Sequence, residues 1–175
     1  MTKVLSKIIS SPRTCGSMNP SDLLIALHFV QTEQCLVKNV IKGKVLITRI
    51  ACDWCIGETR IFTEEVIVFT LQHLISYDTL PTILMRTVIR CHIVHNSLLG
   101  FIINYLQQLI TKQVWKNPSL WKGFIKCCKR TRPQSITVLL QLPQDCFYDL
   151  IKEEPELAAS LKVYMLQMTK SQVLI

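Results

Sequence analysis

Two cysteines and two histidines have the spacing most suggestive of metal or redox chemistry. Cys52 and Cys55 form a CxxC pair in CDWC, and His92 and His95 form an HxxH pair in CHIVH. A zinc site needs four such ligands, but the chain between the two pairs is much longer than the linker of a zinc finger. A redox CxxC belongs near a βαβ unit, and no such pattern precedes CDWC. The spacing therefore favours two cysteines that share a helical face over zinc or redox chemistry.

The chain is rich in cysteine, with eight among 175 residues. Most of them lie inside apolar helical patterns, where free cysteine behaves as a small hydrophobe. The N-terminal MTKVLSKIIS has too short an apolar run for a secretion signal. We therefore expect free thiols in a reducing compartment. The cysteines are Cys15, Cys35, Cys52, Cys55, Cys91, Cys127, Cys128 and Cys146.

The sequence contains no recognisable catalytic motif. GxSxG, a glycine-rich phosphate loop and HExxH are all missing, and each of the four histidines lies on a helical stretch. The acidic run EEPE at 153–156 is most simply explained as the charged start of a helix. No apolar stretch reaches the roughly 18 residues of a membrane span. We expect no enzymatic activity, no cofactor, no small-molecule substrate and no membrane span.

Residues 115–135, WKNPSLWKGFIKCCKRTRPQS, combine tryptophans, a cysteine pair and basic residues without a single acid. On a helix with 3.6 residues per turn, adjacent residues diverge by about 100°, which disfavours a metal ion shared by Cys127 and Cys128. Asn117 and Pro118 mark the start of this helix, and Pro133 marks its end. Its apolar stripe is expected to pack in the core and consists of Trp121, Phe124, Ile125 and Cys128.

A second stripe of the same helix carries Lys122, Lys126 and Lys129, and we expect it to face solvent. The net charge of +8 indicates an acidic partner, either nucleic acid or an acidic protein. Phosphate contacts by the lysines would serve RNA binding, but base stacking is disfavoured because the aromatic residues lie on another face. The candidate partner-binding residues are Lys112, Lys116, Lys122, Lys126, Lys129, Arg130 and Arg132.

These residues require a helical scaffold to position them. Prolines and capping residues recur along a chain that contains only five glycines, and no strand-like alternation persists. The pattern predicts an all-α fold, an antiparallel helix array or α-solenoid-like bundle of about eight to ten helices. Residues 1–18 are expected to form a flexible lead-in, and 19–170 the helical domain. The expected helices cover 20–31, 34–42, segments beginning at Thr63 and Pro81, 97–114, 118–131, 134–142, 145–153 and 155–168.

One segment does not fit this pattern. GKVLITRI, at 43–50, opens with glycine, is rich in β-branched residues and matches no helical face well. We expect a short strand or an inserted loop there. CDWC then returns to a helical turn that ends at Gly57.

Three stretches of the chain closely resemble the C-terminal domain of the symplekin family. They are PSDLLIALHFV at 20–30, LPTILMRTVIRC at 80–91 and the long stretch from LLGFIINYLQQ to VLLQLP at 98–143. The string KQVWK-P-W-GFIKCCKRT-PQS-VLLQLP is distinctive, and the resemblance covers about residues 20–168. Residues 43–50 depart from the family pattern, in which 40–42 run almost directly into ACDWC. They look like an insertion or an error in the gene model.

The resemblance implies a nuclear, non-catalytic, all-helical scaffold domain of pre-mRNA 3′-end processing, with cytoplasmic roles also known in the family. The implied partners are the C-terminal regions of the endonuclease subunit of the cleavage and polyadenylation specificity factor and of its inactive homologue. In this family the CxxC is expected to have only the position of Cys55 as cysteine, which favours packing over metal binding. Direct RNA-backbone binding by the basic face at 112–132 is the alternative function.

Overall fold

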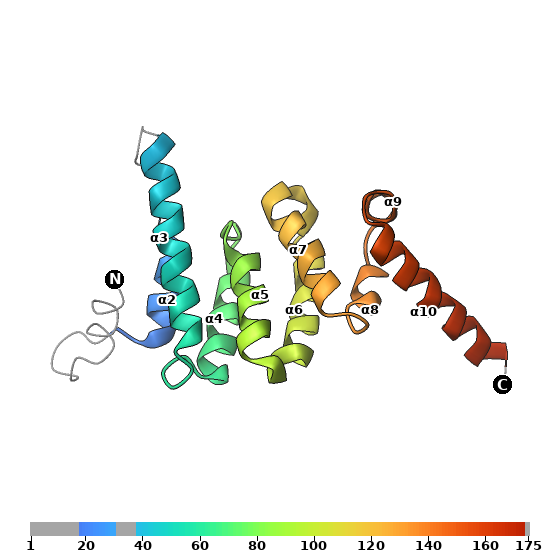
Figure 1. Cartoon of the computed structure of the whole chain (residues 1–175), viewed down its shortest axis with the longest axis horizontal. Coiled ribbons are helices and arrows are strands. Elements are labelled where there is room, and N and C mark those ends of the chain that lie inside the picture. Colours follow the sequence, from blue (N-terminus) through green and yellow to red (C-terminus); the bar gives the residue numbers. More distant parts are fainter. Residues whose placement is uncertain (1–17, 31–37, 174–175) are drawn as a thin grey trace. The chain divides into compact units, whose positions relative to one another are not determined.

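The computed structural model describes residues 18–30 and 38–173, and these residues are all-helical, as the sequence predicts. They form nine α-helices and two short 3-10 helices, without a strand (Figure 1). The predicted lead-in at 1–18 lies almost wholly outside the described residues, as does the start of the helix predicted at 34–42. The fold consists of two compact units, which divide between Leu98 and Leu99.

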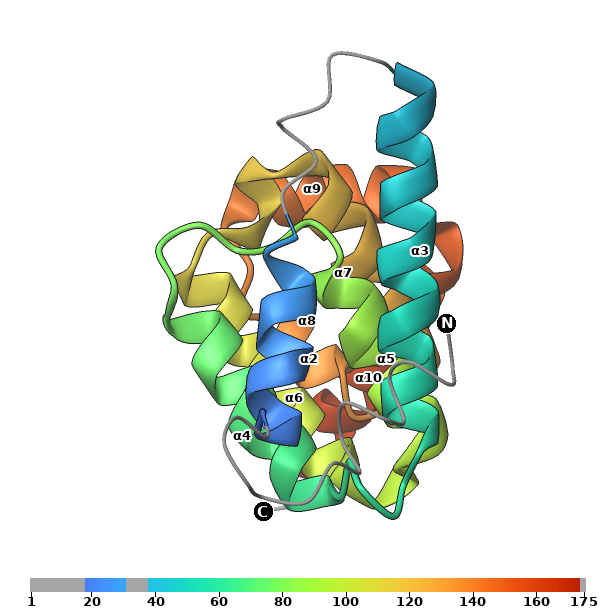
Figure 2. The same cartoon turned by 90° about the vertical axis from the view of Figure 1, so that its left-hand side faces the viewer.

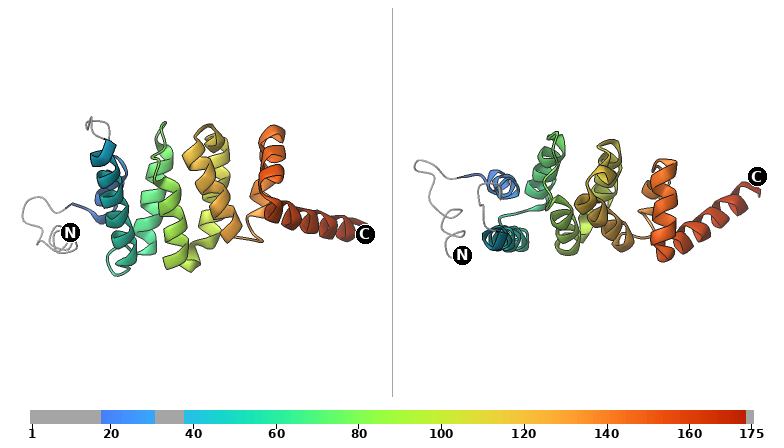
Figure 3. Two further views of the ribbon diagram at one scale, coloured as in Figure 1. Left: turned by 45° about the horizontal axis from the view of Figure 1, so that its top comes forward. Right: turned by 90° about the horizontal axis from the view of Figure 1, so that it is seen from above.

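The first unit is a two-layer array in which consecutive helices run antiparallel. Helices α2 and α4 pack side by side in one layer, and α3 and α5 pack in the other (Figure 3, right). Leu24, Ile56, Ile67 and Leu84 each come from a different helix and are fully buried in this unit. The helices are α2 (Pro20–His28), α3 (Lys38–Gly57), α4 (Glu64–Ser76) and α5 (Leu84–Val94), followed by η1 (Asn96–Leu98).

Helix α3 overturns the expectation for residues 43–50. The strand or loop predicted there is wrong, because 43–50 lie inside one continuous helix of 20 residues that runs beside α2 (Figure 2). β-Branched residues lower helix propensity by only about 0.7 kcal/mol each or less, and tertiary packing outweighs that cost. Thr48, Cys52 and Cys55 recur at helical spacing and are buried. The expected end of the helix at Gly57 is confirmed.

The second unit contains the segment richest in basic residues. Helices α6 and α8 pack together, and α10 packs against both α8 and α9. Helix α9 is seen end-on in Figure 1, while α10 runs across the view, so the two meet at a steep angle. The elements are α6 (Leu99–Thr111), η2 (Val114–Lys116), α7 (Pro118–Arg130), α8 (Ile136–Leu139), α9 (Gln144–Glu153) and α10 (Pro155–Val173).

Two of the capping residues predicted from the sequence form capping hydrogen bonds in the structure. The Thr63 hydroxyl accepts the Val66 N–H at 3.5 Å, and the Asn117 side chain accepts the N–H groups of Ser119 and Leu120 at 3.0 and 3.3 Å. Asn19 precedes α2 with extended backbone, but its side chain makes no capping hydrogen bond. The helix expected to begin at Pro81 begins at Leu84 instead. Among the described helices, none combines the length and apolar character needed to span a membrane.

Candidate functional site

Helix α7 divides into a buried face and a face that borders a groove. Phe124 and Cys128 are fully buried, and Ile125 is 6% exposed. The Ser135 hydroxyl donates to the Cys128 carbonyl at 2.6 Å, which secures the end of α7 to the start of α8. Trp121 differs from its predicted role as a core residue, since it is only half-buried. Its ring stacks on Phe124, with ring centroids 5.4 Å apart and an interplanar angle of 15°.

The groove lies between α7 and the C-terminal half of α9 and has a volume of about 750 Å³. At 3.6 residues per turn, Trp121 and Ile125 lie between the buried face of α7 and its lysines. They therefore form an apolar floor, and the lysines form one rim. The opposite rim is acidic and comes from α9 and the residue that follows it. The lining residues are Pro118, Trp121, Lys122, Ile125, Lys126, Lys129, Asp149, Glu153 and Glu154.

The acidic rim changes the electrostatic character predicted for the lysine stripe. Lys122 and Lys126 are exposed, but Lys129 is half-buried and forms an ion pair with Glu154. Asp149 and Glu153 are one turn apart on α9 and also border the groove. The sequence predicted a solvated cationic face, whereas the structure places carboxylates across from it. The site is therefore a groove with one basic and one acidic rim.

The remaining basic candidates do not border this groove. Lys112 and Lys116 are exposed near η2, and Arg130 is exposed at the end of α7. Arg132 is tied to its own unit, because its guanidinium donates to the Lys129 carbonyl at 3.1 Å and to the Ser160 hydroxyl at 3.2 Å. The predicted set of seven thus separates into three groove lysines and four residues elsewhere.

The CxxC pair lies in the core of the first unit. Cys52 is 3% exposed and Cys55 is fully buried. Burial, as the main cause, raises the pKa of both thiols to about 12. Cys127 and Cys128 are fully buried as well, and burial raises the pKa of both. These thiols are neutral near pH 7, whereas a metal ligand or a nucleophile acts as a thiolate.

The histidines take separate structural positions. His92 lies in the last turn of α5, while His95 is buried just after it. Among the residues that the structure describes, no group of three or more histidine, cysteine, aspartate or glutamate side chains has an arrangement able to hold a metal ion. His28 is buried, with Nδ1 2.7 Å from the Leu24 carbonyl and Nε2 2.8 Å from the Thr87 hydroxyl.

The hydrogen-bond partners of His28 fix the tautomer of its neutral ring. A carbonyl oxygen can only accept, so Nδ1 carries the proton and Nε2 accepts from Thr87. Burial lowers the pKa of His28 and outweighs the opposing effect of the Leu24 carbonyl. His28 therefore joins α2 to α5 as a structural hydrogen-bonding residue.

Two further grooves run along α10. One, of about 630 Å³, lies between α9 and α10 and is almost entirely apolar, with Phe147, Ile151 and Leu161 among its lining residues. The other, of about 600 Å³, lies between α10 and the start of α8, where Arg132, Ile136 and Tyr164 border it. Neither was predicted from the sequence, because both depend on how α10 is packed.

The acidic rim was also missed by sequence reasoning. Glu153 and Glu154 were assigned to a helix start, and Asp149 received no role. Their one signal is that they are clustered acids in a chain of net charge +8. That signal does not say which basic segment they face.

Comparison with known protein families finds a match that covers most of the chain. A family model described as "Symplekin tight junction protein C terminal" matches residues 1–154. The matched region includes α7, α9 and both rims of the groove, and it ends just before α10. No solved structure matches the chain.

Proposed function

This chain belongs to the symplekin C-terminal family, and we propose that it is a non-catalytic scaffold domain of the mRNA 3′-end cleavage and polyadenylation machinery. The family match over residues 1–154 carries the proposal. The proposed partners are the C-terminal regions of the endonuclease subunit of the cleavage and polyadenylation specificity factor and of its inactive homologue. The proposed compartment is the nucleus, with a cytoplasmic pool.

The geometry supports docking of proteins over catalysis. The groove between α7 and α9 combines an apolar floor with charged rims, the composition of a protein-binding surface. Half-buried Trp121 is suited to act as an anchor, because large aromatic side chains contribute much of the binding energy at interfaces. The buried thiols and His28 have structural surroundings that leave them unsuited to act as nucleophile or general base.

RNA-backbone binding by the lysine stripe is less well supported. A phosphate chain along Lys122 and Lys126 would lie opposite Asp149 and Glu153, whose charges repel it. Lys129 is already paired with Glu154. The acidic rim therefore favours a protein partner that carries both signs of charge.

Co-expression tests the scaffold proposal directly. The full chain would be co-expressed with the C-terminal regions of both endonuclease-type subunits and analysed by size-exclusion chromatography. We expect all three to elute together and to remain together at about 0.15 M salt. Separate elution of this chain, when it is folded by circular dichroism, would contradict the proposal.

A further inference from the structure

The groove between α7 and α9 has a charge pattern that specifies more than a basic or an acidic partner. Trp121 and Ile125 form its floor, Lys122 and Lys126 its basic rim, and Asp149 and Glu153 its acidic rim. All four charged rim residues are exposed. They take no part in the ion pairs of Asp53 with Arg86 and of Lys129 with Glu154. Both rims are therefore available to an incoming segment.

The walls of the groove favour a helical occupant. Both walls are helices, whose backbone groups are bonded internally, so the groove offers no strand edge to an extended peptide. An extended peptide in this groove would leave backbone N–H and C=O groups without partners, which costs free energy. A helix pairs these groups internally and so avoids that cost. The lining of α7 from Pro118 to Lys129 extends over about 16 Å, which matches three turns of a partner helix.

The two rims then determine which side chains that helix carries. Its apolar residues, at i, i+3, i+4 and i+7, lie on Trp121 and Ile125. Acidic residues along one edge face Lys122 and Lys126, and basic residues along the other edge face Asp149 and Glu153. A helix with two acidic edges would place like charges against the α9 rim, and a helix with two basic edges would do so against the α7 rim.

We propose that this groove binds one amphipathic partner helix whose apolar stripe is flanked by acidic residues on one edge and basic residues on the other. The proposal rests on the docking function above and specifies the chemistry of the docked segment. It also determines helix direction. Turning a helix end for end exchanges its two edges, so only one direction matches each charge to its opposite.

Three synthetic helices test the charge pattern. All carry the same leucine stripe and the same helix-stabilising crosslink, and their edges are Glu and Lys, Glu and Glu, or Lys and Lys. Binding to the full chain is measured by fluorescence anisotropy at about 0.15 M salt. We expect the mixed helix to bind at least about tenfold more tightly than either symmetric helix.

The net charge of +8 provides a competing expectation. If general attraction to a basic protein governed binding, the helix with two acidic edges would bind most tightly. That order, or the absence of binding by all three helices, would overturn the proposal.

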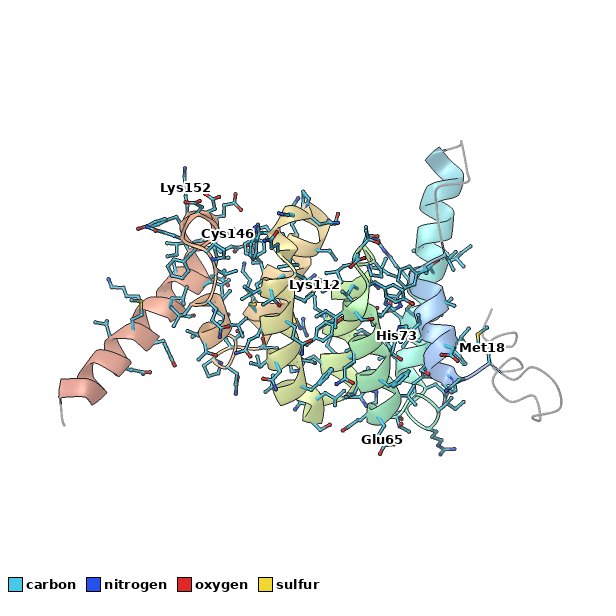
Figure 4. All side chains as sticks on the ribbon, turned by 180° about the vertical axis from the view of Figure 1, so that it is seen from behind. Met18, Glu65, His73, Lys112, Cys146 and Lys152 are labelled. Carbon is cyan, nitrogen blue, oxygen red and sulfur yellow. The ribbon has the colours of Figure 1, made fainter. Side chains whose placement is uncertain are left out.

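A charge-reversal variant makes the test specific to the groove. Lys122→Glu with Lys126→Glu gives two acidic rims, so the helix with two basic edges should become the tightest ligand. Arg60→Glu with Lys152→Glu is the matched control, because both residues are exposed, neither lines the groove, and the net charge is the same. Figure 4 shows Lys152 on α9, pointing away from the body of its unit. The control should keep the original order, and a changed order in the control would overturn the assignment to this groove.

The outcomes separate this proposal from the scaffold function. Intact co-elution with the endonuclease-type subunits, together with no preference for the mixed helix, would contradict only the groove assignment. Loss of co-elution by the unmodified chain would contradict the scaffold function itself.

Discussion

At the residue scale, three described side chains of types that often carry chemistry are buried in the helical core. By residue type, Cys52, Cys55 and His28 are candidate metal ligands or catalytic groups, yet each is buried in a helical layer. Helical spacing predicted this outcome for the cysteines, because Cys52 and Cys55 lie three residues apart and so share a helical face. The hydrogen bonds of His28 were beyond the sequence, since Thr87 lies on a helix far along the chain.

Cys146 should be the most reactive thiol among the described cysteines. It is half-exposed near the start of α9 (Figure 4), whereas Cys52, Cys55, Cys91, Cys127 and Cys128 are buried. Burial also raises the pKa of the Cys146 thiol, aided by Asp145 and Asp149, so its alkylation should be slow in absolute terms. Iodoacetamide labelling at about pH 8, followed by peptide mass spectrometry, should modify Cys146 at least about tenfold faster than the other five. Equal rates in denaturant are the control, and comparable labelling of Cys52 in the folded chain would contradict the prediction.

The first unit should lose stability as pH falls below the ordinary His28 pKa of 6.5. Burial lowers the folded-state pKa, so in the window below 6.5 the unfolded chain binds more protons than the folded chain. Protonation then favours unfolding, and the loss is complete once pH passes below the folded-state value. Urea unfolding between about pH 7.5 and 5 should show a falling midpoint. His28→Gln should be less stable at neutral pH but less sensitive to acid, and an unchanged pH slope in this variant would exclude His28 as the cause.

At the element scale, the sequence predicted two capped helix starts but missed the helical interior of α3. Thr63 and Asn117 are recognisable because a side chain that accepts N–H groups at the first turn is a local device. The helical state of 43–50 could not be predicted locally. Its β-branched residues have weak helix propensity, and the face buried by α3 became visible only with the packing of the first unit.

Asn117 should make a measurable contribution to the second unit. Its side-chain oxygen accepts two N–H groups at the start of α7, the helix that carries the basic rim. Asn117→Ala should lower the free energy of unfolding by about 1 kcal/mol, measured by urea denaturation. Asn117→Ser retains an acceptor and should lose much less. Equal losses in the two variants would show that the cap itself contributes nothing.

At the scale of the whole molecule, composition predicted the all-α class and the basic character, but not where charge is neutralised. Residues 122–129 and 149–154 belong to different helices, so no local pattern reveals that they border one groove. The sequence therefore predicted a uniformly cationic stripe. In the structure, the net charge of the chain is +8, whereas its groove carries both basic and acidic side chains.

This difference between the net charge of the chain and the mixed charge of its groove predicts how the chain binds RNA. A protein of net charge +8 should bind RNA weakly and with strong salt dependence, through basic residues spread over its surface. Because Asp149 and Glu153 oppose phosphates near the groove, Lys122→Glu with Lys126→Glu should weaken RNA binding no more than the matched Arg60→Glu with Lys152→Glu. Filter binding of a single-stranded RNA across a salt series measures both variants. A loss of affinity about tenfold larger for the groove variant, with a reduced salt slope, would assign the lysine rim to phosphate contacts and favour RNA over a protein helix.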